Sequence, residues 1–244
     1  MTGGALVGGE RPLAGTSALV TGATRGIGGA VARRLARAGA NLHLLARSRA
    51  ALEKVVGTVG GCAWPADLED PEGLEETLGR LLSLRGAPDV VVNAAGVFDL
   101  APFVQTSLEI FDRALGANLR GPFLVIRALL PAMLERGSGV IVTVGSVAGY
   151  RAFPRNAAYS ASKFGLRGMH EVLSEELRGT GVRATLIEPG ATDTTIWDPH
   201  RPEEGADLPD RADMLRADDV ADAVLFAATR PADVVLPLLR IQRG

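Results

Sequence analysis

The chain has 244 residues, with 26 Lys and Arg against 28 Asp and Glu, so its formal net charge is −2. This balance lacks the basic excess of a dedicated nucleic-acid-binding protein. A single cysteine, Cys62, excludes a fold held by intramolecular disulfides. No window approaches the roughly 18 uninterrupted apolar residues of a membrane span, and the first residues lack the basic start and apolar block of a signal peptide. We therefore expect a soluble, cytoplasmic protein.

Short apolar runs alternate with segments of helical apolar spacing, a pattern typical of βαβ units in a parallel sheet. The predicted strands are Ser17–Thr21, Asn41–Leu45, Gly61–Pro65, Asp89–Asn93, Val140–Val144, Val182–Ile187 and Asp233–Arg240. The predicted helices are Ile27–Ala38, Pro71–Leu84, Ser107–Asn118, Pro122–Glu135, Tyr159–Arg178 and Asp218–Thr229. Pro237 cannot donate to a sheet ladder, so the last strand is an edge or its assignment is wrong. The pattern predicts an α/β fold, a doubly wound parallel sheet with helices on both faces.

The chain shows no internal repeat and no low-complexity linker, which favours one domain over residues 15–244, preceded by a disordered leader at 1–14. The long irregular stretch is Ala191–Leu215, which contains three prolines and many carboxylates. Such a stretch is either a solvated surface excursion or a mobile lid over a site.

A glycine-rich turn joins the first predicted strand to the first predicted helix. Glycines at Gly22, Gly26 and Gly28, with Thr24, Arg25 and Ile27 between them, permit a tight turn and a close approach of the backbone to a pyrophosphate at the helix N-terminus. Glycine also ends strands and caps helices, so the motif alone is weak. Its place between strand and helix supports dinucleotide binding, and no Gly-Lys-Ser or Gly-Lys-Thr follows to make it a nucleoside-triphosphate loop.

The end of the second strand bears on the choice of dinucleotide. An acid there usually accepts from the adenosine ribose in NAD sites, whereas an arginine accommodates the 2′-phosphate of NADP. Here the strand ends at Arg47, the next acid is Glu53 in the following helix, and Arg25 is a second cation in the glycine turn. Although isolated surface arginines usually carry no function, two cations without an acid favour NADP(H) over NAD(H).

Tyr159 and Lys163 lie four residues apart and share one face if the segment is helical. An ammonium beside a phenol would lower a pKa that starts near 10, which suits an acid/base at ordinary pH. Such a pair alone can be an accident of a helix surface. Ser146, 13 residues upstream of Tyr159 at the carboxyl end of an apolar strand, favours a catalytic site, because ligand crevices open at that edge.

With these motifs in order, the chain resembles the short-chain dehydrogenase/reductase family, in its compact single-domain branch, from about Gly15 to Ala228. The marks are Thr21-Gly22-x-x-x-Gly26-x-Gly28, Asp67-Leu68, Asn93-Ala94-Ala95-Gly96, Asn118, Ser146, Tyr159-x-x-x-Lys163 and Pro189-Gly190. The resemblance implies a Rossmann-like sheet of seven parallel strands with the last strand at an edge. It also implies a homo-oligomer, dimer or tetramer, although the chain lacks the Gly-Gly segment with which many members end.

Carried over to this sequence, the resemblance makes Tyr159 the acid/base, Ser146 the group that polarises the substrate oxygen, Lys163 the binder of the nicotinamide ribose, and Asn118 the holder of a water in a proton relay. It places the adenine on Asp67 and Leu68, the adenosine ribose and pyrophosphate over Asn93, Ala94 and Gly96, and the nicotinamide carboxamide beside Pro189, Gly190, Thr192 and Thr194. It also makes the stretch from Ala191 the substrate loop, which favours the lid.

The implied function is NADP(H)-dependent hydride transfer between nicotinamide and a carbonyl or secondary alcohol, without a metal, because His43, His170 and His200 are scattered. Beside Ser146 and Tyr159, we expect the substrate to meet a partly apolar pocket of Ala148, Tyr150, Phe153 and Trp197. A 3-oxoacyl reductase is one generic possibility, and Arg151 and Arg155 could meet an acidic substrate or carrier. A catalytically silent dinucleotide-binding regulator on the same fold remains an alternative. A sugar-nucleotide epimerase would need a larger C-terminal domain and a different glycine turn.

Overall fold

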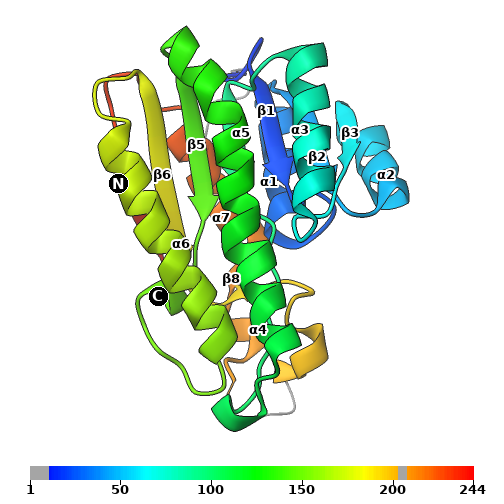
Figure 1. Cartoon of the computed structure of the whole chain (residues 1–244), viewed down its shortest axis with the longest axis vertical. Helices are drawn as coiled ribbons and strands as arrows, with labels where there is room; N and C mark the ends of the chain where they lie inside the picture. The colour runs from blue at the N-terminus through cyan, green and yellow to red at the C-terminus, as the bar shows by residue number, and fades with distance from the viewer. Residues whose placement is uncertain (1–10, 203–207) are drawn as a thin grey trace.

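In the computed structural model, which describes residues 11–202 and 208–244, seven strands form one parallel sheet in the order β3-β2-β1-β4-β5-β6-β9. The strands are β1 Ser17–Thr21, β2 Asn41–Ala46, β3 Cys62–Pro65, β4 Val90–Asn93, β5 Gly139–Val144, β6 Val182–Pro189 and β9 Leu238–Ile241. This arrangement confirms the predicted single-domain, doubly wound parallel sheet. The arrowheads of β1 and β5 point down in Figure 1, so the carboxyl ends of the strands lie at the lower end of the molecule.

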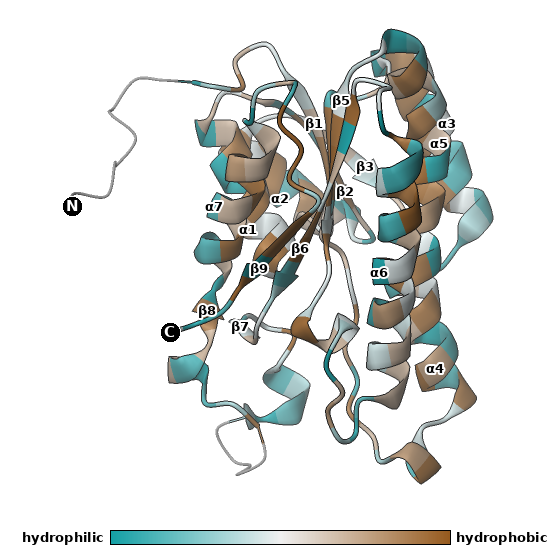
Figure 2. Ribbon diagram, turned by 90° about the vertical axis from the view of Figure 1, so that its left-hand side faces the viewer, coloured by the Kyte–Doolittle hydropathy of each residue, from teal (hydrophilic) through white to brown (hydrophobic). Residues whose placement is uncertain are grey.

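Helices cover both faces of the sheet. They are α1 Gly26–Arg37, α2 Arg49–Val59, α3 Pro71–Arg85, α4 Leu108–Leu115, α5 Gly121–Arg136, α6 Ala157–Glu176 and α7 Ala217–Ala228. Seen edge-on, α1, α2 and α7 lie on one side of the sheet and α3, α5 and α6 on the other (Figure 2).

The continuous apolar runs of the strands follow from this three-layer packing. Successive strand residues point to opposite faces, and on β4 Val90 and Val92 pack in the core beneath α1 and α7 while Val91 packs in the core beneath α3 and α5. Because helices cover both faces of the sheet, a strand with one polar face would bury its polar side chains away from water. Full burial of each such side chain contributes about 1.5–3 kcal/mol.

Local signals in the sequence set several helix starts. Ser48 accepts a hydrogen bond from the backbone N–H of Ala51 at 3.2 Å, and Ser107 accepts one from Ile110 at 3.2 Å. Asp70 caps α3 in the same way, and Pro71 occupies the first turn, where its missing N–H costs no hydrogen bond.

The last strand is shorter than predicted. β9 begins at Leu238, directly after Pro237, so residues 233–237 of the predicted strand are not part of it. Instead, the N–H of Val234 donates to the carbonyl of Pro231 at 3.0 Å and forms a turn. The carbonyl of Pro237 accepts from the N–H of Leu186. β9 pairs with β6 alone and is the edge strand that the proline required.

The predicted break between the third and fourth predicted helices, Ser107–Asn118 and Pro122–Glu135, does not exist. α4 continues through a π-helical turn, Gly116–Arg120, directly into α5. The whole stretch, Leu108–Arg136, is long and apolar enough to cross a membrane by length and composition, and half of its most apolar window is buried within the protein. Leu129 and Met133 are fully buried in the core on the α3 side of the sheet, so α5 is a core helix here.

The predicted disordered leader spanned residues 1–14. Residues 1–10 lie outside the described part of the chain, but residues 11–14 pack on the domain, which corrects the boundary. Leu13 is 4% exposed, and its N–H donates to the carbonyl of Ala38 at 2.9 Å.

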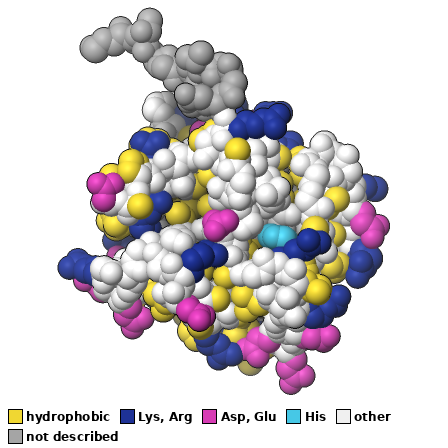
Figure 3. Space-filling view, turned by 90° about the horizontal axis from the view of Figure 1, so that it is seen from above, with side chains coloured by type: hydrophobic (Ala, Val, Ile, Leu, Met, Phe, Trp, Pro, Cys, Tyr) yellow, Lys and Arg dark blue, Asp and Glu magenta, His cyan; other side chains and the backbone are white. Residues whose placement is uncertain are grey.

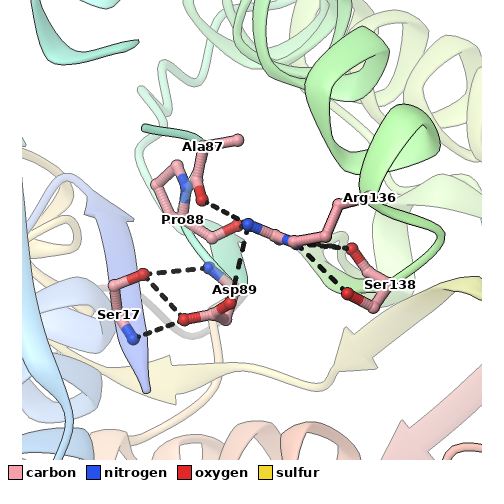
Figure 4. A network of polar contacts seen from close by, with 6 residues as sticks. All are labelled: Ser17, Ala87, Pro88, Asp89, Arg136 and Ser138. Carbon is pink, nitrogen blue, oxygen red and sulfur yellow. Dashed lines mark hydrogen bonds and ion pairs between the residues drawn. The ribbon is translucent and has the colours of Figure 1, made fainter. Parts of the chain in front are cut away.

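A polar network ties together the amino ends of the central strands, at the edge opposite the crevice described below. Asp89 accepts from both the N–H and the hydroxyl of Ser17 at 2.8 Å, and Arg136 donates to the carbonyls of Ala87 and Pro88 and to Ser138 (Figure 4). Viewed from this end, side chains of both charge signs are interspersed over the surface (Figure 3).

Candidate active site

The strand order reverses at β1, and the loops after β1 and β4 leave the sheet in opposite directions. Doubly wound sheets bind ligands in the crevice that opens at such a point. A Cβ on Gly22, which follows β1, would lie 2.8 Å from Cα of Ala95, which follows β4. The two loops therefore touch, and glycine is required at position 22 both by this approach and by its φ of +68°.

The predicted glycine turn opens α1 as expected. A Cβ on Gly28 would lie 2.3 Å from the carbonyl oxygen of Gly22, so only glycine lets the helix start this close to the turn. Arg25 occupies the N-cap without a side-chain capping bond, and no acid lies in the first helical turn. Thr24 and Ile27 are half-buried in the same turn. The first N–H groups and the positive end of the helix dipole suit an anion such as a pyrophosphate.

The end of β4 carries a buried amide whose polar atoms have no partner within the described residues. Asn93 is 2% exposed, and both Oδ1 and Nδ2 lack hydrogen bonds. The next two N–H groups, of Ala94 and Ala95, donate to the hydroxyl of Thr21 at 3.1 and 3.2 Å. Because buried amides are nearly always paired, Asn93 fits a site where a ribose or phosphate group completes its hydrogen bonding.

The residues expected near the adenosine end lie around the loop after β3. Arg47 is exposed, and its guanidinium lies 4.0 Å from the carboxylate of Glu69. Asp67 accepts from the N–H of Glu69 at 3.0 Å, and Leu68 is buried against Gly121. Arg25 is exposed at the N-cap of α1. The sequence analysis did not include Glu69, because this acid reaches the end of β2 from the loop after the neighbouring strand, β3.

Ser146 and Tyr159 meet at the carboxyl end of β5. Ser146 follows β5 after Gly145, and its hydroxyl accepts from the N–H of Ala148 at 3.1 Å. Tyr159 lies in the first turn of α6, is half-buried, and has the Ser146 side chain beside its phenol. Burial raises the pKa of the Tyr159 phenol, and the interaction with the Ser146 side chain opposes part of that rise.

Lys163 lies one turn further along α6 and is 5% exposed. Its ammonium donates to the carbonyl of Val144 at 3.0 Å and lies 5.8 Å from the ring centroid of Tyr159. Burial lowers the pKa of Lys163 to about 8. The sequence predicted that this ammonium lowers the pKa of Tyr159. The structure corrects that direction, because desolvation of the phenol dominates and the ammonium is bonded to a carbonyl.

Asn118 enters the same site from the π-helical turn, a type of distortion that is frequent at functional sites. Its side chain accepts from the N–H of Val97 at 2.8 Å and donates to the Val97 carbonyl and the Ser162 hydroxyl at 3.0 Å. A Cβ on Gly96 would lie 3.0 Å from Oδ1 of Asn118 and 4.0 Å from Nζ of Lys163. Asn118 and Lys163 therefore converge around Gly96.

The segment after β6 runs back toward the glycine turn. The N–H of Gly190, which follows Pro189, donates to the carbonyl of Ile241 at 2.8 Å, and the Thr192 hydroxyl donates to the Gly190 carbonyl at 3.0 Å. The methyl group of Thr194 lies 3.5 Å from the Cβ position of Gly26. This places the expected carboxamide-binding segment across the crevice from the N-terminus of α1.

The predicted lid, Ala191–Leu215, is anchored at both ends. Two short strands, β7 Thr192–Asp193 and β8 Leu215–Arg216, pair with each other. Between them, Arg211 binds Asp193 and Asp198, each at 2.7 Å. The described parts of the stretch are thus held together by polar contacts, and residues 203–207 lie outside the described residues.

An aromatic cluster that sequence reasoning missed joins the lid to Tyr159. Phe98 packs edge to face on Tyr159, Trp197 and His200, with ring centroids 4.8, 4.9 and 5.0 Å apart. The Nε2–H of His200 donates to the Phe98 carbonyl at 3.1 Å. The proximity of Phe98 to Gly96 in the sequence is the one signal that could have indicated its role. Trp197, a predicted substrate residue, contacts Phe98, which in turn contacts Tyr159.

Of the other expected substrate residues, some lie near Ser146 and Tyr159 and some contact other elements. Ala148 is buried next to Ser146. Tyr150 instead faces the C-terminal strand, where Arg240 stacks over its ring at 4.0 Å and Gln242 donates to its hydroxyl. Phe153 lies under the guanidinium of Arg151 at 5.3 Å. The structure therefore brings Trp197 and Ala148 to the catalytic groups, but gives Tyr150 partners on another element.

Residues 11–202 and 208–244 contain no group of three His, Cys, Asp or Glu side chains placed to hold a metal ion. His43 accepts a hydrogen bond from the indole of Trp64 at 3.2 Å, His170 is buried within α6, and His200 is part of the aromatic cluster.

The strand order, glycine turn and paired Ser146 and Tyr159 define a dinucleotide-binding oxidoreductase domain of the doubly wound class. The family described as short chain dehydrogenase matches residues 16–205. A D-threitol dehydrogenase of Mycolicibacterium smegmatis is 34% identical over 232 residues, which cover 91% of this chain and 89% of that one. The chain belongs to the short chain dehydrogenase family and is an oxidoreductase with an NAD(P)-binding Rossmann fold.

Solved structures agree with this assignment. A metagenomic short-chain oxidoreductase in complex with NADP has a TM-score of 0.79 and 32% identity, covering 96% of this chain and 100% of that one. A protein named ribose-5-phosphate isomerase from Brucella melitensis 16M has a TM-score of 0.88 and 29% identity, covering 97% and 94%. One fold can host different reactions, so the reaction of this chain depends on the residues of its own site.

Proposed function

We propose that this protein is an NADP(H)-dependent oxidoreductase that interconverts a carbonyl compound and its secondary alcohol. The observation that carries the proposal is the Tyr159 phenol, which lies beside the Ser146 side chain and one helical turn from the buried ammonium of Lys163, at the edge of the sheet where the dinucleotide crevice opens. A bound nicotinamide dinucleotide supplies or accepts the hydride.

The chain's own residues handle the charge that develops on the substrate oxygen. In the reducing direction Ser146 donates a hydrogen bond to that oxygen and Tyr159 transfers its proton, so the alkoxide is neutralised where it forms. At neutral pH the Tyr159 phenol carries its proton, as an ordinary phenol does, and can therefore act as the proton donor. Lys163 and Asn118 border the same space around Gly96, where the ammonium can bind the nicotinamide ribose and the amide can hold a relay water.

The preference for NADP(H) rests on Arg25 and Arg47. Both are exposed at the adenosine end of the crevice, and each can pair with a 2′-phosphate. Glu69 approaches Arg47 only to 4.0 Å and leaves its guanidinium accessible. The similar oxidoreductase in complex with NADP supports the same choice.

The substrate pocket we infer is partly apolar. Phe98 and Trp197 lie on the approach to Tyr159, and the lid brings them together over the site. Ketones with an apolar arm fit this lining, and 3-oxoacyl compounds are one class to include.

The activity test is consumption of NADPH with a panel of ketones and 3-oxoacyl thioesters, and of NADP⁺ with hydroxy acids and secondary alcohols. Turnover with at least one compound, lost in Tyr159→Phe, supports the proposal. A protein that binds NADPH without turning over any compound is instead the silent regulatory protein that the same fold permits.

Assembly into a homo-oligomer is also proposed, on exposed apolar side chains of the helices at one face. Leu108 on α4, Phe123 on α5 and Phe164 on α6 are 79%, 44% and 47% exposed, and large exposed apolar side chains on a helical surface favour a protein contact. Light scattering of the purified chain measures the assembly, and a monomer would contradict it.

A further inference from the structure

A buried carboxylate lies directly beneath the loop that carries Ser146. Glu188, on β6, is 1% exposed. Its Oε2 accepts from Nε of Arg240 at 2.9 Å, and its Oε1 lies 3.6 Å from Nη1 of Arg167. A buried carboxylate persists when such partners neutralise it, and loss of one partner leaves an uncompensated charge. Glu188 therefore joins β6, β9 and α6 at one point.

The two glycines that flank Ser146 let its loop rest on this carboxylate. A Cβ on Gly145 would lie 3.4 Å from Cγ of Glu188, and one on Gly149 would lie 3.7 Å from its Oε1. The same Cβ on Gly149 would lie 3.0 Å from the carbonyl oxygen of Lys163. The loop is thus confined between Glu188 and the backbone of the catalytic helix.

The far end of the loop is held by the C-terminal residues. The guanidinium of Arg240 stacks over the ring of Tyr150 at 4.0 Å, and Gln242 donates to the Tyr150 hydroxyl at 3.0 Å. Arg240 contacts the loop residue Tyr150 and the supporting carboxylate at once. A planar guanidinium can lie flat on a ring while its edge donates hydrogen bonds, a geometry that the point charge of a lysine ammonium does not reproduce.

The same C-terminal segment touches the two other segments that line the site. The carbonyl of Ile241 accepts from Gly190 at 2.8 Å, and Arg243 donates to the carbonyl of Met214 at 3.1 Å, next to the end of the lid. Residues 240–243 therefore tie the serine loop, the cofactor segment and the lid to one edge strand.

We propose that Arg240 is a positioning residue, which with Glu188 and Tyr150 holds the serine loop so that the Ser146 hydroxyl stays aligned with the Tyr159 phenol. The inference rests on the proposed function, because alignment affects turnover only if Ser146 polarises the substrate oxygen. A misplacement of about 1 Å at a reacting group can cost on the order of 10²-fold in rate. In this proposal Tyr150 is the residue through which Arg240 holds the serine loop, rather than a substrate contact.

A double-mutant cycle with Ser146 tests the proposal. Arg240→Met removes the hydrogen bond and stack but keeps an apolar stem, and we expect kcat to fall about tenfold with NADPH affinity changed less than about twofold. In the Ser146→Ala background the same change should lower kcat by less than about twofold, because the hydroxyl that Arg240 positions is gone. Arg240→Lys, which keeps the charge beside Glu188, should recover part of the loss.

Arg230→Met is the matched control. Arg230 stacks over Phe226 at 3.9 Å at the end of α7, and its loss should leave kcat unchanged. If Arg240→Met does not fold, Gln242→Ala carries the test with a smaller loss and the same dependence on Ser146.

Equal losses in the wild-type and Ser146→Ala backgrounds, or unchanged kcat in a folded Arg240→Met protein, would overturn the positioning role while the wild-type activity stands. A wild-type protein inactive on the whole panel would overturn the proposed function itself.

Discussion

The ring of Phe98 packs edge to face on the ring of Tyr159, with centroids 4.8 Å apart and planes at 74°. Phe98 makes the same kind of contact with Trp197 and His200 of the lid. The proposed acid/base and the lid therefore share one aromatic residue as a packing partner.

The lid is expected to become better protected when cofactor binds. Pairing of β7 with β8 fixes its ends, while Thr192 and Thr194 lie beside the crevice and can couple its first turn to the carboxamide. Amide hydrogen exchange over residues 191–215 should slow with NADPH. In a Trp64→Phe variant the emission of Trp197 should change as well. Equally slow exchange with and without NADPH would show a fixed part of the fold.

Replacing Tyr159 by Phe should keep NADPH binding and lower turnover by roughly 10²–10⁴-fold, the usual contribution of a positioned acid/base. The ring contact with Phe98 is retained in this variant, so the melting temperature should stay close to that of the wild type. Steady-state rates and a fluorescence titration with NADPH measure the two quantities. Turnover near the wild-type rate would remove Tyr159 from the acid/base role.

Arg47→Asp should narrow or reverse the preference for NADPH over NADH. A lost pair with the 2′-phosphate is worth on the order of 1.5–3 kcal/mol, or roughly tenfold to a hundredfold in affinity. Arg37→Asp is the control, because it makes the same charge change at an exposed position at the end of α1. Equal wild-type affinities for NADPH and NADH in titration calorimetry would contradict the cofactor proposal.

Lys163→Met should stabilise the protein while abolishing turnover. Burial lowers the pKa of Lys163 to about 8 from 10.5, so folding disfavours its charged form, and below pH 8 the ammonium is charged in both states and the full penalty applies. The variant also loses the hydrogen bond to the Val144 carbonyl, which offsets part of this gain. The net increase in unfolding free energy should be about 1–3 kcal/mol at pH 7 without cofactor. Urea unfolding measures it, and a destabilised variant would show that the ammonium holds the apo fold together.

His170 should make the fold sensitive to mild acid. It is 1% exposed, neither ring nitrogen has a partner among the described residues, and burial lowers its pKa to about 4. A base whose folded pKa lies below its unfolded value contributes stability that is complete above pH 6.5 and is lost as the pH falls toward 4. The loss should be about 3 kcal/mol over this window.

The replacement His170→Leu isolates this effect from the carboxylates that titrate in the same range. The difference in unfolding free energy between the variant and the wild type should grow as the pH falls from 6.5 and level off near 4. A difference that stays constant with pH would mean that His170 is not buried in its neutral form.

Much of the fold could be predicted because its signals are local. The apolar runs of β1, β4 and β5, the glycine turn and the capping residues act on neighbours a few positions away, and parallel strands bring their carboxyl ends, with Asn93 and Ser146, to one edge. The prediction from sequence was wrong where the pairing of strands decides the structure. Residues 234–236 are as apolar as a strand, but the strand pairing with β6 begins only at Leu238.

The details of the site depended on contacts between distant parts of the chain. The pKa of Tyr159 is set by burial, which no spacing of Tyr and Lys reveals. The contacts of Phe98 with His200 and of Glu188 with Arg240 join residues 102 and 52 positions apart. The sequence by itself determined which chemical groups are present and which sheet edge they reach, because strand direction and hydrophobic period are local properties. Their alignment, burial and partners were decided by tertiary packing, which alone brings distant side chains within contact distance.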